Sequence, residues 1–129
     1  MKKTIIFSAF ALCVSMGTLN AKTNNFNFEN NHVVKPYNVN SFCVSIAMGD
    51  LETVKKLISL GEDVNKKSNG MTPAMYAAKY NRTEILELLI AEGADLKLKS
   101  DKKMTAADYA KLHGAKDTYA IIEASLSKK

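Results

Sequence analysis

The stretch GMTPAMYAA, residues 70–78, decides the fold, because a near copy, KMTAADYAK, follows at residues 103–111. Thr72 can cap the start of a helix with its hydroxyl, and Pro73 suits the first helical position, where no N–H group is needed. The two copies are 33 residues apart. A turn and helix start repeated at this period is typical of a solenoid, in which each unit buries its apolar face against the next.

The residues around the two copies repeat as well. Gly-Glu-Asp at residues 61–63 matches Gly-Ala-Asp at residues 93–95, at an offset of 32. The glycine of each triplet can end a helix in the left-handed conformation. Between the two copies lies a second helical pattern, with a broad apolar face formed by Ile85, Leu86, Leu88, Leu89 and Ile90. Each unit therefore contains two short helices, a glycine turn and a polar stretch.

Residues 70–95, GMTPAMYAAKYNRTEILELLIAEGAD, resemble an ankyrin repeat, whose pattern is a finger turn, a Thr-Pro-Leu-His-x-Ala-Ala helix, a second apolar helix and Gly-Ala-Asp. The likeness extends over about residues 40–125. It implies an all-α fold, a short ankyrin-repeat solenoid of about three helix-turn-helix units with finger turns. We expect the ankyrin-repeat domain at residues 40–127, with units at about 40–67, 68–99 and 100–127.

Four positions depart from the ankyrin pattern. Met75 stands where the family has histidine, so the usual Thr–His hydrogen bond cannot form there. In the last unit Asp108 takes this place, and its spacing from Thr105 predicts a capping box. Lys103 replaces the glycine of the finger, and Lys111 replaces a small alanine. Lys111 would be awkward between two packed units but suits a terminal unit with a polar outer face.

The N-terminus has the three parts of a secretory signal peptide. A basic start at residues 1–3 precedes the apolar residues 4–16, which are too few to span a bilayer, and Ala21 offers a cleavage site. We expect residues 1–21 to be a signal peptide, with a buried N-terminal helix as the alternative. The mature protein would then be exported to a periplasm or, alternatively, secreted. Removal of the two lysines in this segment lowers the formal net charge from +5 to +3.

Residues 22–39 form an asparagine-rich stretch without a helical period. Asparagine side chains compete for backbone hydrogen bonds and favour turns over helices. We therefore expect an extended arm, with a partner-binding tail as the alternative. After the arm, Asn40 or Ser41 is expected to cap the first helix, since the first unit lacks the Thr-Pro pair.

No catalytic constellation stands out in the mature sequence, and we expect a protein that is not an enzyme and uses no cofactor and no metal. Cys43 occupies the histidine position of the first unit, where a small core residue is the favoured interpretation and a reactive thiol the alternative. His113 has helical spacing to Asp117, but two ligands do not make a metal site. A small redox or metal protein that uses Cys43 or His113 is thus an alternative function.

Lysines crowd the finger segments, at Lys66, Lys67, Lys97, Lys99, Lys102 and Lys103. We interpret them first as a solvated face and second as a surface for an acidic partner. The mildly basic charge of the mature chain and the lack of aromatic residues interleaved with these lysines argue against nucleic acid as the partner.

Ankyrin repeats typically bind other proteins through a concave side, formed by the finger tips and the exposed ends of the inner helices. Carried onto this sequence, the resemblance implies ten partner-binding positions: Met48, Asn69, Met71, Lys79, Tyr80, Asp101, Lys102, Met104, Leu112 and His113. The alternative is that these residues only cover the helix ends of neighbouring units. We expect an exported protein–protein interaction module, a monomer without a membrane span. An inhibitor or immunity-type protein that blocks a periplasmic enzyme is the alternative.

Overall fold

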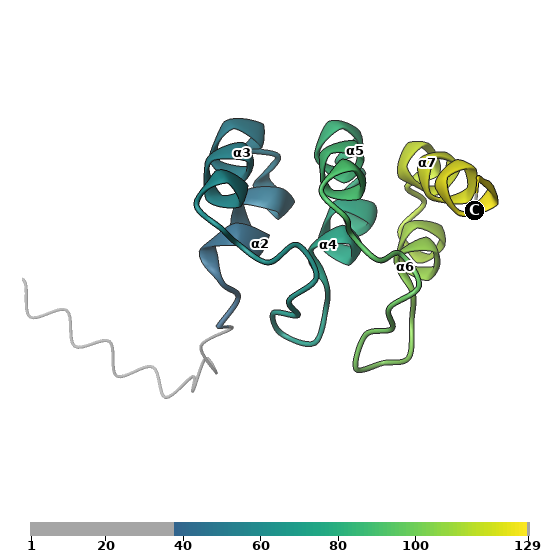
Figure 1. The fold of residues 1–129 in the computed structure, drawn as a ribbon. Coiled ribbons are helices and arrows are strands. Elements are labelled where there is room, and N and C mark those ends of the chain that lie inside the picture. The colour runs from purple at the N-terminus through teal and green to yellow at the C-terminus, as the bar shows by residue number, and fades with distance from the viewer. Residues whose placement is uncertain (1–37, 129) are drawn as a thin grey trace, which may run out of the picture. The chain divides into compact units, whose positions relative to one another are not determined.

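The computed structural model describes residues 38–128, which contain six helices arranged in three pairs. Their bounds are α2 (Ser41–Met48), α3 (Leu51–Ser59), α4 (Pro73–Lys79), α5 (Thr83–Ala91), α6 (Ala106–Leu112) and α7 (Lys116–Ser127). Figure 1 shows the three pairs side by side, with two finger loops extending beyond α4 and α6. We name residues 61–72 the first finger and residues 93–105 the second finger.

These helices confirm the predicted all-α class. Apart from one isolated bridge between Ser68 and Met71, residues 38–128 contain no strand. No helix within the same range has the length and apolar character that crossing a bilayer requires. The predicted signal peptide, residues 1–21, lies outside the described residues, and so does the predicted arm, residues 22–39, except for its last two residues.

The inner helices α4 and α6 begin at the side-chain caps that the sequence predicts. The Thr72 hydroxyl accepts a hydrogen bond from the Met75 N–H at 3.3 Å, with Pro73 at the first helical position. In the last unit, the Asp108 N–H donates to the Thr105 hydroxyl at 3.3 Å, and the Thr105 N–H donates to the Asp108 carboxylate at 2.9 Å. The bonds from the Thr105 backbone and hydroxyl lower the pKa of Asp108. The predicted capping box is therefore confirmed.

Two further contacts at helix starts refine what the sequence implied. Asn40, rather than Ser41, caps α2, because its Oδ1 accepts a hydrogen bond from the Cys43 N–H at 2.9 Å. In the middle unit, the Sδ of Met75 accepts a hydrogen bond from the Thr72 N–H at 3.3 Å. Sulfur is a weak acceptor, so the methionine supplies a weaker substitute for the histidine link of the family.

The three pairs share one core, because small residues let the inner helices approach one another. Ala77 and Ala78 of α4 and Ala110 of α6 are fully buried. α4 packs more extensively against α6 than against any other helix. Larger side chains fill the remaining space, among them Phe42, Ile46, Val54, Leu86, Leu89 and Ile122, all fully buried. The middle unit is thus covered on both sides.

Two side chains join the first unit to the middle one. The guanidinium of Arg82 donates to the Ala47 carbonyl from Nε at 3.0 Å and from Nη2 at 2.8 Å. The side chain of Asn65 donates to the Gly93 carbonyl at 3.2 Å and accepts a hydrogen bond from the Asp95 N–H at 2.8 Å. The junction is therefore held both at the helix ends and at the bases of the fingers.

The last unit is joined to the middle one around Thr118, which is fully buried in α7. Its hydroxyl donates to the Ala78 carbonyl at 3.1 Å, and its N–H donates to Asn81 Oδ1 at 3.2 Å. The Nδ2 of Asn81 in turn donates to the Asp117 carboxylate at 3.0 Å. Buried polar groups at this junction are thereby satisfied, as a packed interface requires.

Lys103 holds a backbone conformation that residues with a side chain rarely adopt. Its φ is +65°, and the matching residue of the first finger is Gly70, with φ +80°. The left-handed region costs such a residue about 1–2 kcal/mol. We expect Lys103→Gly to raise the free energy of unfolding by roughly 0.5–1 kcal/mol, because relief of this strain exceeds the entropy that glycine loses on folding. Urea unfolding of variant and parent measures the difference, and unchanged or lower stability would contradict the expectation.

Candidate partner-binding groove

The surface is hollowed where the two fingers meet the ends of α4 and α6. This hollow, which we call the finger groove, has a volume of about 490 Å³. Its lining consists of Asn69, Gly70, Met71, Lys79, Asp101, Lys102, Met104, Tyr109, Leu112 and His113. Eight of the ten positions that the sequence singles out lie in this lining, and the two others, Met48 and Tyr80, do not.

A tight turn presents the tip of the first finger. Ser68 and Met71 exchange both backbone hydrogen bonds, at 2.9 and 3.2 Å. Between them, Asn69 and Gly70 have positive φ angles of 52° and 80°. Asparagine and glycine are the residues that adopt this conformation most readily, so the Asn-Gly pair specifies the turn. The exposed side chain of Asn69 reaches the groove as a result.

Two buried tyrosines fix the fingers to the inner helices. The hydroxyl of Tyr76 in α4 donates to the Ser68 carbonyl at 2.9 Å, and the hydroxyl of Tyr109 in α6 donates to Ser100 Oγ at 3.1 Å. Burial raises the pKa of Tyr76 to about 12, so its hydroxyl keeps its proton and stays a donor. Each finger is therefore anchored to the helix whose far end lines the groove.

The two finger tips touch. The Asp101 N–H donates to the Gly70 carbonyl at 3.0 Å, and a Cβ on Gly70 would lie 2.7 Å from Asp101 Oδ2. The Nζ of Lys67 lies 3.6 Å from Asp101 Oδ1, in an exposed ion pair. Such a pair adds little stability, but it offsets the one carboxylate of the lining. Lys79 and Lys102 then make the groove positively charged.

Three apolar side chains line the same groove. Leu112, at the end of α6, is 67% exposed, whereas Met71 and Met104 are half-buried. The exposed side chain of His113 follows Leu112. Flexible methionine side chains adapt to differently shaped partners, and grouped exposed apolar side chains are typical of interaction sites. The groove therefore offers an apolar contact area with a cationic border.

Met48 and Tyr80 end α2 and α4 at the positions that correspond to His113 in α6. Their exposed fractions are 73% and 43%. The Nζ of Lys79 lies 5.3 Å from the centroid of the Tyr80 ring, within the range of a cation–π contact. Lys79 therefore lines the finger groove and also contacts the exposed Tyr80 ring at the same end of α4.

A family model of ankyrin repeats in three copies matches residues 41–124. The chain belongs to the ankyrin repeat family. Ankyrin repeats are protein-interaction modules. Among curated proteins, myotrophin of Xenopus tropicalis is 42% identical over 55 residues, which cover 42% of this chain and 47% of myotrophin. Ankyrin repeat domain-containing protein 40 of Homo sapiens is 36% identical over 58 residues, 43% of this chain and 16% of that protein.

A solved structure also matches this ankyrin chain. It is the complex of the Bd0816 predatory endopeptidase from Bdellovibrio bacteriovorus with the immunity protein Bd3460. The matched chain is 29% identical, with a TM-score of 0.62, and the match covers 65% of this chain and 45% of that chain. The ankyrin chain thus spans less than half the length of these relatives.

The ankyrin helices separate the two residues of the redox or metal alternative. Cys43 is fully buried in α2, and burial, together with the charge of Glu62, raises the pKa of its thiol to about 12. His113 ends α6, while Asp117 lies in α7. Residues 38–128 contain no cluster of three or more His, Cys, Asp and Glu side chains placed to hold a metal ion. Burial favours a core role for Cys43 over a reactive one.

Alkylation tests this role of Cys43 directly. In a Cys13→Ser variant, in which Cys43 is the one remaining thiol, we expect iodoacetamide at neutral pH to react at least about 1,000-fold more slowly with the native protein than with the urea-unfolded one. A thiol pKa of about 12 in place of 9.0 lowers the thiolate fraction by about this factor. Mass spectrometry of quenched samples gives both rates, and native alkylation within tenfold of the unfolded rate would revive the reactive alternative.

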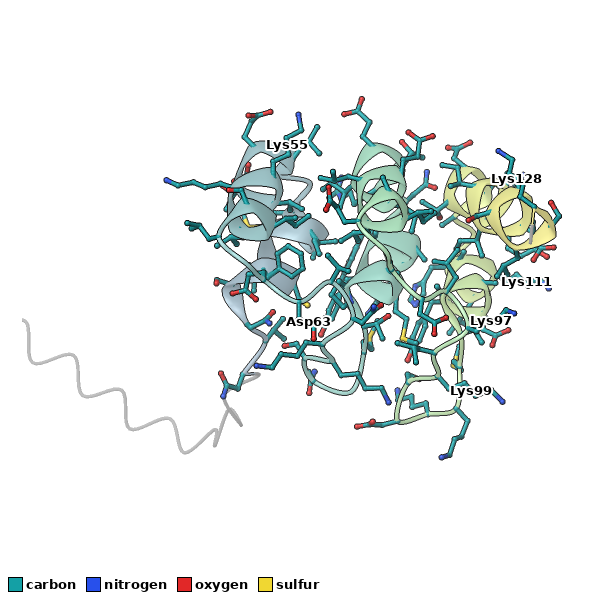
Figure 2. All side chains as sticks on the ribbon, in the orientation of Figure 1. Lys55, Asp63, Lys97, Lys99, Lys111 and Lys128 are labelled. Carbon is teal, nitrogen blue, oxygen red and sulfur yellow. The ribbon has the colours of Figure 1, made fainter. Side chains whose placement is uncertain are left out.

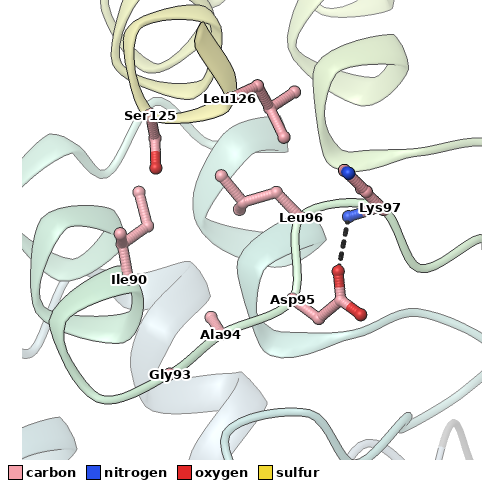
Figure 3. A pocket seen from close by; sticks show the side chains of 8 residues that line it. All are labelled: Ile90, Gly93, Ala94, Asp95, Leu96, Lys97, Ser125 and Leu126. Atoms are coloured by element: carbon pink, nitrogen blue, oxygen red, sulfur yellow. Dashed lines mark hydrogen bonds between the residues drawn. The ribbon is translucent and has the colours of Figure 1, made fainter. Parts of the chain in front are cut away.

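A second hollow, of about 470 Å³, lies where α5 and α7 end (Figure 3) and was not predicted. Its apolar lining includes Ile90, Leu96 and Leu126. Lys97 stands here at the position of Asn65 in the first finger, and a lysine side chain cannot accept the hydrogen bond that Asn65 accepts. The Lys97 N–H donates to the Asp95 carboxylate at 2.9 Å, just as the Asn65 N–H donates to the Asp63 carboxylate at 2.8 Å in the first finger. In the sequence, the feature that points to this hollow is the lysine at position 97, where the first finger, 32 residues earlier, has asparagine.

Proposed function

We propose that the chain is a non-enzymatic ankyrin module that binds a protein partner in the finger groove and over the adjoining ends of the inner helices. The groove itself carries the proposal, because two loops and two helix ends bring an exposed leucine, Leu112, together with Lys79 and Lys102. A protein segment that fills the groove would remove the apolar surface of Leu112 from water, which favours association. The module is proposed to act as a monomer and without nucleic acid.

We further propose that the protein is exported. The basic start, the apolar residues 4–16 and Ala21 support a signal peptide at residues 1–21. A periplasm is the favoured destination, with secretion as the alternative. The partner would then be a protein of the same compartment.

An immunity-type role is a second candidate, supported by the match to the complex of an endopeptidase with an immunity protein. In this role the partner would be an enzyme, and the module would block its access to substrate. The two candidates share one surface, so they differ in what happens to the partner rather than in where it binds. An activity assay of the captured partner, with and without the module, separates them.

Crosslinking and capture test the proposed surface. The full chain, tagged at its C-terminus, is expressed in its native host, and captured proteins are identified by mass spectrometry. Binding of each purified candidate is then measured with Leu112→Ser and with Leu60→Ser. Leu60 caps α3 outside the groove and is 72% exposed, against 67% for Leu112, so the two variants lose similar exposed surface.

The two variants should differ clearly. We expect Leu112→Ser to weaken binding by about tenfold or more, as truncation of a central interface residue does, and Leu60→Ser to change it by less than about twofold. If both variants lose the same amount of affinity for the partner, or neither loses any, the partner binds elsewhere. Circular dichroism of both variants verifies that the helices are intact.

A further inference from the structure

The finger tips carry a concentrated positive charge. Residues 66–71 and 97–104 contain six lysines and one acidic residue, Asp101, which is paired with Lys67. All six lysines are exposed. Figure 2 shows Lys99 on the second finger, well away from Lys55 and Lys128 on the outer helices. A local field of this kind attracts groups of opposite charge.

The outer helix of the middle unit has the opposite character. Its exposed ionisable side chains are those of Glu84, Glu87 and Glu92. The finger tips are therefore basic, whereas the middle unit is acidic along α5. An acidic protein surface would be attracted towards the fingers and repelled from this helix, so the charge pattern favours one orientation of approach.

The groove combines this charge with apolar contact area. Lys79 comes from α4 and Lys102 from the second finger tip, so cationic groups from two units border one hollow. Leu112, Met71 and Met104 supply its apolar lining. A ligand that satisfies both features carries carboxylates beside a bulky apolar side chain.

Resting on the proposed function, we propose that the partner presents an acidic protein segment, in which Asp or Glu residues flank a bulky apolar side chain. The apolar side chain contacts Leu112, and the flanking carboxylates meet Lys79 and Lys102. A nucleic acid fits this site less well, because Tyr109 is buried and Tyr80 lies outside the groove, so the lining offers no exposed Phe, Tyr or Trp ring on which a base could stack. The volume of about 490 Å³ suits one or two side chains of such a segment.

Synthetic probes test the chemistry without knowledge of the partner. The full chain, labelled with nitrogen-15, is titrated with a short peptide in which Asp and Glu surround a leucine–phenylalanine pair. Parallel titrations use a peptide with lysines in place of the acidic residues, oligothymidylate, and phosphatidylcholine vesicles that contain phosphatidylglycerol. We expect the acidic peptide to shift the amide signals of Asp101, Lys102 and Leu112, and the lysine peptide to leave them unchanged.

Charge reversal supplies the matched variants. Lys79→Glu with Lys102→Glu should weaken binding of the acidic peptide by about tenfold or more and reduce its salt dependence. Lys56→Glu with Lys128→Glu makes the same change in net charge on the exposed surfaces of α3 and the end of α7, and should leave binding within about twofold. Circular dichroism verifies that both double variants are folded.

Several results would overturn the proposal. One is that the lysine peptide binds as tightly as the acidic peptide. Another is that both double variants lose the same amount of affinity for the acidic peptide. The third is that the amide signals of groove residues do not shift with the acidic peptide up to about 1 mM. If oligothymidylate or the vesicles shift the same amide signals and bind more tightly than the acidic peptide, the surface belongs to another class of ligand. If a captured protein partner is lost by Leu112→Ser but kept by the Lys79 and Lys102 double variant, the proposed function holds and this inference fails.

Discussion

Replacing Leu86 by alanine should lower the free energy of unfolding by about 3 kcal/mol. Leu86 lies in α5 of the middle unit and has no exposed surface. Its removal loses the transfer free energy of the deleted methyl groups and leaves a cavity that close-packed neighbours cannot fill. In domains of this size, each kcal/mol of lost stability lowers the melting temperature by several degrees. We therefore expect the melting temperature to fall by an amount on the order of 15 °C.

Chemical and thermal unfolding of Leu86→Ala and of the control Leu60→Ala measure this effect. Leu60 is 72% exposed, and its truncation should change the free energy of unfolding by less than about 0.5 kcal/mol. A loss below about 1 kcal/mol for Leu86→Ala would show that the middle unit is much less tightly packed than the buried side chains indicate.

Removing the last unit should abolish cooperative unfolding altogether. A chain that ends at Lys99 lacks α6 and α7, and with them the buried side chains of Tyr109, Ala110 and Ile122. The apolar face of α4 that packs against α6 would then meet water. Short solenoids need about three units to offset the entropy of ordering the chain, because each unit gains stability from its neighbours.

Thermal unfolding followed by circular dichroism is the measurement for this truncation. The expected result is weak helical signal at room temperature and a gradual change on heating, against one sharp transition for the full chain. A truncated chain that unfolds in a sharp transition, at a melting temperature within a few degrees of that of the full chain, would contradict this expectation. The first two units would then fold independently of the last.

The sequence predicts the repeat and its local turns well, because these depend on residues close together in the chain. The Thr105 and Asp108 capping box follows from their spacing, and it forms in the structure. The left-handed helix ends at Gly61 and Gly93 also form, with φ of 99° and 94°. Lys111 is exposed on the last unit, in keeping with a terminal position. The offset of about 33 residues then places equivalent positions on equivalent surfaces of each unit.

The sequence does not predict which of these surfaces enclose a common space. Met48, Tyr80 and His113 are equivalent by offset, yet only His113 lines the finger groove. The groove depends on the approach of two finger tips, set by the hydrogen bond from the Asp101 N–H to the Gly70 carbonyl. A backbone contact of this kind leaves no mark in the side-chain pattern. The link between Arg82 and the Ala47 carbonyl escapes sequence reasoning for the same reason.

The hydrogen bonds from Arg82 to the Ala47 carbonyl also bear on how readily the binding specificity of this protein can be altered. Arg82, Thr118 and Asp101 each attach one unit to its neighbour by donating to a main-chain carbonyl, at Ala47, Ala78 and Gly70 respectively. A carbonyl is present whatever side chain the residue carries. Exposed side chains at the helix ends and finger tips can therefore be exchanged while these attachments persist. The chain is thus suited to a combinatorial library, in which Met48, Tyr80, Lys102 and Leu112 are randomised and new binders are selected without redesign of the stack.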